Sequence, residues 1–159
     1  MEPKKQISRR EVLAATTALG SFTFLPAHVL GRGGALAPSE KLNIAFIGVG
    51  GRGSVNIENL KHHNIVGFCD VDWRTDLQYY LPLASKVIKD YPGVKRFDDY
   101  RKMLQELDKS IDAVVVSTPD HTHAVATMMA MKMRKHVYCE KPLAHSINEI
   151  RALTAAARK

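Results

Sequence analysis

The sequence is poor in the patterns that mark several large classes of protein. It has two cysteines among 159 residues, and it shows neither an internal repeat nor a low-complexity tract. Aromatic residues make up 7% and no basic stripe is interleaved with them, so the formal net charge of +7 does not indicate a nucleic-acid partner. The composition, 45% hydrophobic and 25% charged, is typical of a globular protein.

The first 37 residues are predicted to be an export signal. Arg9 and Arg10 precede an uncharged segment at 12–27, and a small-x-small pattern at 35–37 stands directly before Pro38. These are the three parts of a secretory signal. The paired arginines resemble a twin-arginine signal, with Val12 where that motif more often has phenylalanine. This pattern predicts a protein exported to the periplasm by the twin-arginine route.

A membrane anchor is the alternative interpretation of this segment. Its apolar stretch is shorter than the roughly 20 residues that a span needs, and Gly20 and Pro26 interrupt it. No cysteine lies near the cleavage region, which argues against a lipoprotein anchor. We therefore expect no stable membrane span after the signal is cleaved.

Strand and helix patterns alternate from Lys41 onward. Short apolar runs predict buried strands, and apolar positions at helical spacing predict the helices between them. The five predicted strands are 42–47, 65–69, 94–97, 113–116 and 136–139. The predicted helices are 54–61, 76–89 with a break at Pro82, one that Asp98 or Asp99 caps, 122–132, and one that begins with a capping box at Ser146. Five such units predict an α/β fold, a doubly wound parallel sheet of the Rossmann type in three layers, over residues 38–159.

The two cysteines are predicted to be free, buried thiols. Cys69 ends the second predicted strand and Cys139 ends the fifth. In a doubly wound order these strands are three positions apart, or about 14 Å at roughly 4.8 Å per strand. A disulfide needs Cα atoms within about 7 Å, so this order excludes the bridge.

A glycine loop follows the first predicted strand. Gly48, Gly50 and Gly53 fit the G-x-G-x-x-G spacing, and Asp70 lies about 20 positions later, at the end of the second strand. In a dinucleotide-binding fold such glycines let the backbone approach a pyrophosphate, and such an acid binds the ribose 2′-hydroxyl. The pattern therefore predicts a dinucleotide site.

The acid also bears on which dinucleotide is bound. A carboxylate at Asp70 repels a 2′-phosphate, which favours NAD over NADP. Arg52 and Arg74 weaken this preference, because a nearby arginine can accommodate a 2′-phosphate. Asp72 is the second candidate for the ribose carboxylate, because strand alternation points it to the same side as Asp70.

Two later turns carry further polar residues, Thr118–His123 and Glu140-Lys141-Pro142. Both follow the carboxyl ends of predicted strands, where open α/β sheets bind ligands, so we expect both turns and the glycine loop to converge on one crevice. Lys141 is either a solvated surface lysine or a group that polarises a substrate hydroxyl or carbonyl. His121 and His123 form an H-x-H pair without a third ligand in the same turn, so no metal site is predicted.

The segments IGVGGRG, CDVD, STPDHTHA and CEKPLA, in this order and spacing, resemble the N-terminal half of Gfo/Idh/MocA-type oxidoreductases over residues 41–159. The resemblance implies NAD(P)-dependent hydride transfer with a sugar or polyol. The residues implied around the pyrophosphate are Gly48, Gly50, Gly51, Arg52 and Gly53, with Asp70 on the adenosine ribose. The residues implied near the nicotinamide are Thr118, Pro119, His123 and Glu140. Lys141 is the implied catalytic residue, in contact with both the nicotinamide region and the reacting hydroxyl.

Members of this family continue into a second α/β domain that supplies most substrate contacts, and residues up to Lys159 do not include it. We therefore expect this part alone to be inactive, and a longer form to be a homo-oligomer. Two alternatives to a dehydrogenase stay open. One is a glycosidase of the same family that oxidises its substrate transiently with bound NAD, and the other is a non-catalytic dinucleotide-binding fragment.

Overall fold

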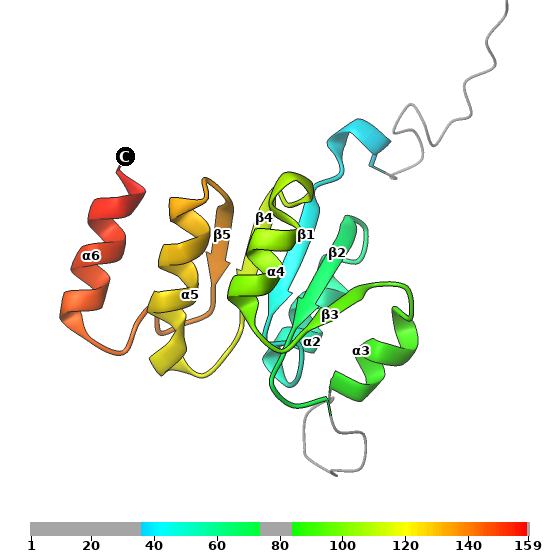
Figure 1. Cartoon of the computed structure of the whole chain (residues 1–159), viewed down its shortest axis with the longest axis horizontal. Coiled ribbons are helices and arrows are strands. Elements are labelled where there is room, and N and C mark those ends of the chain that lie inside the picture. Colours follow the sequence, from blue (N-terminus) through cyan, green and yellow to red (C-terminus); the bar gives the residue numbers. More distant parts are fainter. Residues whose placement is uncertain (1–35, 74–83, 159) are drawn as a thin grey trace, which may run out of the picture. The chain divides into compact units, whose positions relative to one another are not determined.

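The computed structural model describes residues 36–73 and 84–158 (Figure 1). The predicted export signal lies outside these residues except for its last two positions. Arg74 and the first part of the helix predicted at 76–89 also lie outside them. A compact unit begins at Pro38. Within the described ranges, none of the helices has the length and hydropathy that crossing a bilayer requires.

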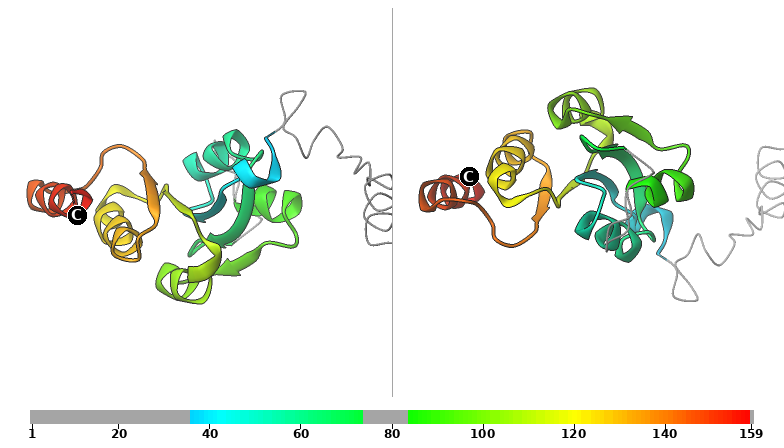
Figure 2. Two further views of the ribbon diagram at one scale, coloured as in Figure 1. Left: turned by 90° about the horizontal axis from the view of Figure 1, so that it is seen from above. Right: turned by 90° about the horizontal axis from the view of Figure 1, so that it is seen from below.

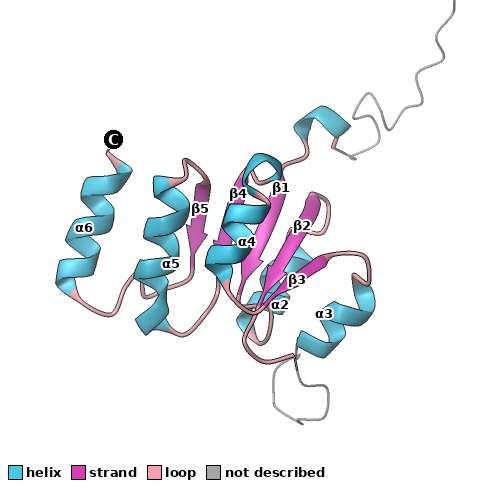
Figure 3. Cartoon of the chain, in the orientation of Figure 1, coloured by secondary structure: helices cyan, strands magenta, loops and turns pink. Residues whose placement is uncertain are grey.

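Strands and helices alternate along this unit (Figure 3). The strands are β1 (Asn43–Ile47), β2 (Asn64–Cys69), β3 (Lys95–Phe97), β4 (Ala113–Val116) and β5 (His136–Cys139). The α-helices are α2 (Arg52–Asn59), α3 (Ala84–Asp90), α4 (Tyr100–Glu106), α5 (Asp120–Lys132) and α6 (Ile147–Ala157). Two 3-10 turns, η3 (Pro38–Glu40) and η4 (Asp108–Ser110), complete the order.

The strands of the described part form one parallel sheet in the order β3-β2-β1-β4-β5. Figure 2 shows α2 and α3 on one face of the sheet and α4 and α5 on the other, with α6 beside α5. From β1 the chain adds β2 and then β3 on one side of the sheet. It then crosses back to the other side of β1, where it adds β4 and then β5. This is the predicted doubly wound, three-layer fold, and it places the switch in direction between β1 and β4.

Alternation along the strands sends apolar side chains into two cores. Ile44 and Phe46 of β1 pack in the cluster with α2 and α3, whereas Ala45 and Ile47 pack in the cluster with α4 and α5. All four side chains are almost fully buried. A strand covered on both faces has no polar side to show, which is why β1 reads as a continuous apolar run.

Two helices begin two residues earlier than predicted. The loop before α2 ends at Gly51, whose φ of 50° differs from helical geometry, and helical turns start at once with Arg52. Pro119, with a φ of −58°, directly precedes α5, which therefore starts at Asp120. Asp99, one of the two predicted caps, accepts a hydrogen bond from the Arg101 backbone at the start of α4.

Both cysteines are free, as predicted, and they differ in burial. Cys69 lies in the core, where burial raises the pKa of its thiol to about 12. The prediction of a buried thiol is wrong for Cys139, which is half-buried. Its strand, β5, ends the order of the sheet, so fewer elements cover it.

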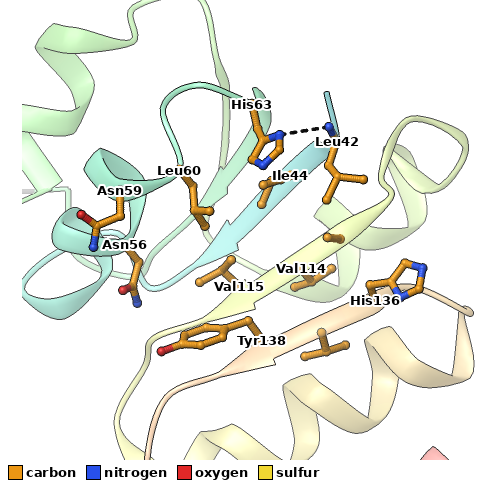
Figure 4. Close-up of a pocket in the computed structure, with 12 residues that line it drawn as sticks. Leu42, Ile44, Asn56, Asn59, Leu60, His63, Val114, Val115, His136 and Tyr138 are labelled. Carbon is orange, nitrogen blue, oxygen red and sulfur yellow. Dashed lines mark hydrogen bonds between the residues drawn. The ribbon is translucent and has the colours of Figure 1, made fainter. Parts of the chain in front are cut away.

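An apolar groove of about 430 Å³ runs along β1, β4 and β5 beside α2 (Figure 4). Leu42, Ile44 and Val115 lie along its floor, and Tyr138 lies at its border on β5. The groove follows the strands and does not lie at their carboxyl ends. It is therefore separate from the polar turns, although Asn56 of α2 lines it and also reaches them.

Candidate functional site

Two adjoining hollows lie where the strands end. The loop hollow, of about 400 Å³, is lined by Gly48, Gly50 and Asp70 among others. The lysine hollow, of about 780 Å³, is lined by Arg52, Ser117, Thr118, Asp120, His123, Tyr138, Glu140, Lys141 and Pro142. Ser117 and Thr118 line both. The three predicted segments therefore converge, and the turn after β4 joins the two hollows.

The glycine loop is packed too tightly for side chains. Gly48 has a φ of +84°, and a Cβ atom there would lie 2.8 Å from the Ser117 carbonyl. A Cβ atom on Gly53 would lie 2.0 Å from the Gly48 carbonyl oxygen. The first turn of α2 thus lies directly on the end of β1, and only glycine permits this approach. The arrangement aims the start of α2 at the strand ends, as a pyrophosphate site requires.

Asp70 holds this loop from the end of β2. Its Oδ2 atom accepts hydrogen bonds from the Val49 backbone at 2.8 Å and the Gly50 backbone at 3.3 Å. Its Oδ1 atom accepts one from the Asp72 backbone at 3.1 Å. Asp70 and Asp72 are the two candidates for the ribose carboxylate. Asp70 lines the loop hollow beside the glycines, whereas Asp72 does not line it.

Glu140 is the centre of a polar network in the lysine hollow. Its Oε1 atom accepts hydrogen bonds from Asn56 Nδ2 at 2.8 Å and Arg52 Nε at 2.9 Å. Asn56 Nδ2 also donates to Ser117 Oγ at 3.0 Å. The Tyr138 hydroxyl lies 3.4 Å from the same carboxylate oxygen. Through these contacts α2, β4 and β5 are joined at one buried acid, which is 8% exposed.

The network keeps Glu140 ionised. Hydrogen bonds from Asn56 and Arg52 hold the pKa of its carboxyl below the ordinary value, against the opposing effect of burial. The same contact raises the pKa of the Arg52 guanidinium. Arg52 contacts Glu140 through Nε, and its side chain stays 61% exposed.

The two histidines of the H-x-H pair lie on α5 and differ in exposure. His121 is exposed, with Nδ1 3.8 Å from Asp120 Oδ1, and it lines the loop hollow. His123 is 2% exposed and its ring lies between two backbone carbonyl oxygens, Pro142 O at 2.7 Å from Nδ1 and Thr118 O at 2.6 Å from Nε2. Among the described residues, no group of three or more His, Cys, Asp or Glu side chains is arranged to hold a metal ion.

Lys141 lies at the mouth of the lysine hollow. Its side chain is exposed, and within the described ranges its ammonium has no hydrogen-bond or ion-pair partner. Thr118 and Pro119 form the opposite turn, where Thr118 Oγ1 accepts a hydrogen bond from Thr122 Oγ1 at 2.7 Å. Lys141 and Thr118 line the same hollow, so the exposed ammonium is available to a ligand hydroxyl there.

The sequence patterns did not reveal Asn56, Ser117 or Tyr138. Asn56 is the most informative omission, because it is buried and bonds residues 61 and 84 positions away. The available signal was its spacing of four from Arg52 on a helix, which puts both side chains on one face. Without the fold, that spacing does not indicate a shared carboxylate.

The comparison with protein families gives one match over this region. The profile of GFO_IDH_MocA, described as an oxidoreductase family with an NAD-binding Rossmann fold, matches residues 42–159. The chain belongs to this family. Its fold and loop geometry are those of the NAD-binding domain of such oxidoreductases.

Individual relatives cover the same part of the chain. Glycosyl hydrolase family 109 protein 1 of Akkermansia muciniphila is 34% identical over 126 residues, which is 74% of this chain and 25% of the relative. Inositol 2-dehydrogenase of Rubrobacter xylanophilus is 30% identical over 122 residues, which is 74% of this chain and 32% of the relative. The chain thus spans about a quarter to a third of the length of these relatives.

Solved structures agree with this placement. Myo-inositol 2-dehydrogenase of Lactobacillus plantarum superposes with a TM-score of 0.60 at 25% identity, over 74% of this chain and 33% of that one. GenD2 from gentamicin A biosynthesis, solved in complex with NAD, gives a TM-score of 0.62 at 26% identity, over 74% and 32%. In each of these two structures the matched part is about a third of the solved chain.

Replacing Gly53 with alanine tests the tight contact between β1 and α2. We expect G53A to lower the free energy of unfolding by about 3 kcal/mol or more, because the new Cβ meets backbone and not a side chain that can move. Thermal or urea unfolding measures this. The matched control is G93A, where nothing lies within 4 Å and stability should change by about 0.5 kcal/mol at most. Equal stability of the two variants would contradict the packing described here.

Glu140→Gln tests the carboxylate network through its pH dependence. The folded-state pKa of Glu140 is depressed, so its contribution is present above the ordinary value of 4.5 and is lost as the pH falls through the lower folded-state value. We expect E140Q to be less stable than the wild type by about 1 kcal/mol at neutral pH. The gap should close only below pH 4.5. Glu106→Gln, which removes an exposed pairing with Lys95, is the control that should change little. A gap that stays constant down to acid pH would refute the assignment.

Proposed function

We propose that this chain supplies the cofactor half of an NAD-dependent enzyme that transfers a hydride between a nicotinamide and a sugar or polyol. The observation that supports it most directly is the pair of joined hollows. The glycine loop and Asp70 line one, Lys141 lines the other, and Ser117 and Thr118 belong to both. A dinucleotide bound across this turn would be held by the glycine loop and Arg52 at its phosphates and by Lys141 near its nicotinamide.

The residues present fit such a cofactor. Gly48 and Gly53 leave no space for Cβ atoms, which is the cradle that a pyrophosphate needs, and α2 starts there without a side-chain cap. The exposed guanidinium nitrogens of Arg52 supply positive charge to the same place. When bound, the nicotinamide accepts or donates the hydride, and the protein supplies binding and orientation.

Asp70 supports NAD as the preferred cofactor. Its carboxylate faces the loop hollow, where it is available to the hydroxyls of an adenosine ribose. A 2′-phosphate in that position would meet a negative charge. Arg74, which argued for NADP in the sequence, lies outside the described residues.

Lys141 is proposed as the catalytic residue. Its unpaired ammonium at the lysine hollow would hold the oxygen of the reacting hydroxyl by a hydrogen bond. During oxidation the carbon would lose a hydride to the nicotinamide and the hydroxyl would lose its proton to solvent. The Lys141 ammonium, already protonated, would stabilise the negative charge that develops on the oxygen. Thr118 lines the same hollow and Pro119 lines the loop hollow, while Glu140 is held by Asn56 directly before the lysine.

Two alternative functions keep specific support. The 34% identity to a glycosyl hydrolase family 109 protein favours a glycosidase that oxidises and re-reduces its substrate without net change in the cofactor. The other alternative is a non-catalytic dinucleotide-binding module, which the loop hollow with Gly48, Gly50 and Asp70 supports by itself. We also propose that the protein is exported by the twin-arginine route, on its N-terminal sequence, and that a longer form is a homo-oligomer.

Titration calorimetry with NAD and NADP tests the cofactor assignment. We expect NAD to bind the 159-residue chain more tightly than NADP. Asp70→Asn keeps an oxygen that can accept from the Val49 backbone but removes the charge, so NAD should bind roughly 10-fold more weakly and the preference over NADP should shrink. Asp72→Asn is the matched control and should retain the preference. Tighter binding of NADP by the wild type would overturn the assignment.

Lys141→Ala tests the chemical role in the longest natural polypeptide that carries this chain. We expect turnover to fall by about 10²-fold or more, while the dissociation constant for NAD changes little, because the glycine loop lies in the other hollow. Lys109→Ala, at an exposed position in η4, is the control. Undiminished turnover in K141A would refute the catalytic role. Net NADH formation with free sugars supports a dehydrogenase, whereas aglycone release without net NADH supports the glycosidase.

A further inference from the structure

The side chain of His123 is buried, and a contact with the nicotinamide does not explain this burial. It is 2% exposed, so almost none of the ring is available to a ligand. Both ring nitrogens are already in contact with the protein. Nδ1 lies 2.7 Å from Pro142 O, and Nε2 lies 2.6 Å from Thr118 O.

Both partners are carbonyl oxygens, which accept hydrogen bonds and cannot donate them. A neutral imidazole has one N–H donor, and its second nitrogen carries a lone pair. A lone pair facing a carbonyl oxygen at such a distance is repulsive. Only a ring with a proton on each nitrogen donates to both partners at once. The two short separations match the charge-assisted class of hydrogen bond, at about 2.7–2.9 Å, better than the neutral class.

We propose that His123 is a doubly protonated brace that ties the turn after β4 to the turn after β5 and thereby positions Lys141. Its two bonds end on Thr118 in one turn and on Pro142 in the other. Lys141 is the residue directly before Pro142. His123 therefore acts on the reacting atoms through Lys141 and is a positioning residue. The positional role rests on the function proposed above, whereas the protonation state does not.

The charges around the lysine hollow are mixed. The Glu140 carboxylate, ionised and fixed by Asn56 and Arg52, favours a cation nearby. Asp120, one turn before His123 on α5, is a second carboxylate, with His145 Nδ1 3.4 Å from its Oδ2. Lys141 and Arg52 oppose a further positive charge. The two carbonyl oxygens supply the direct stabilisation of the doubly protonated ring.

Nitrogen NMR tests the protonation state directly. In the 159-residue chain labelled with ¹⁵N-histidine, we expect both His123 nitrogens to show the shifts of protonated nitrogen at neutral pH. Exposed His62 provides the internal reference for a histidine ring in solvent. His123→Gln identifies the signals. A lone-pair nitrogen shift for His123 in the wild type at neutral pH would overturn the proposal, whatever the activity.

Kinetics test the positioning role in the longest natural polypeptide that carries the chain. Glutamine offers donors from a single nitrogen, so H123Q can satisfy only one of the two carbonyls. We expect kcat to fall by roughly 10- to 100-fold, the effect of a misplaced reacting group, with NAD affinity within a few-fold of wild type. His62→Gln should leave both unchanged. Unchanged kcat in a folded H123Q would refute the positioning role. Absence of any turnover in the wild type would refute the proposed function while the NMR result still decides the brace.

Discussion

The close approach of two glycines at the end of β1 is the constraint on which the rest of the site depends. Gly53 lies so near the Gly48 carbonyl that no Cβ atom fits, and Gly48 is equally close to the turn after β4. This contact places the first turn of α2 directly above the strand ends. Arg52 and Asn56 reach the turn after β5 only because their helix begins there.

The polar network and the histidine brace give the lysine hollow fixed walls from different sides. Glu140 connects α2 to β5, and His123 connects α5 to the residue after Lys141. Both use buried polar groups, which form good hydrogen bonds only in one arrangement and are costly to leave unpaired. The lysine side chain itself is exposed, and nothing in the described part of the chain pairs with its ammonium.

Much of the fold could be predicted because local and global preferences agree. The runs at 42–47 and 113–116 are apolar throughout, and such runs are the central strands β1 and β4. Two helices, α2 at Arg52 and α5 at Asp120, begin two residues before their predicted starts. In each case a glycine or proline directly precedes the first helical residue, and the apolar pattern of the side chains does not reveal this. The half-buried state of Cys139 followed from its place on the last strand of the order, which composition alone does not give.

The site was less predictable in its contacts than in its location. The rule that ligands bind at strand ends located all three turns, but it could not say that His123 is enclosed while His121 is exposed. Helical rotation separates neighbours two apart, and only the packing of α5 decides which one turns inward. Asn56 was missed for a similar reason, because an asparagine on a helix is commonly solvated and its partners are remote in the sequence.

Asp70 combines two tasks in one side chain, and this limits how the cofactor site can change. Its carboxylate ties the backbone at Val49 and Gly50 to the end of β2, and the same residue lines the loop hollow. A substitution to asparagine removes the charge and keeps only one of the two carboxylate oxygens that now accept hydrogen bonds there. A change at this position therefore alters the hydrogen bonds of the glycine loop together with the charge beside it. Loop geometry and local charge are coupled through one side chain.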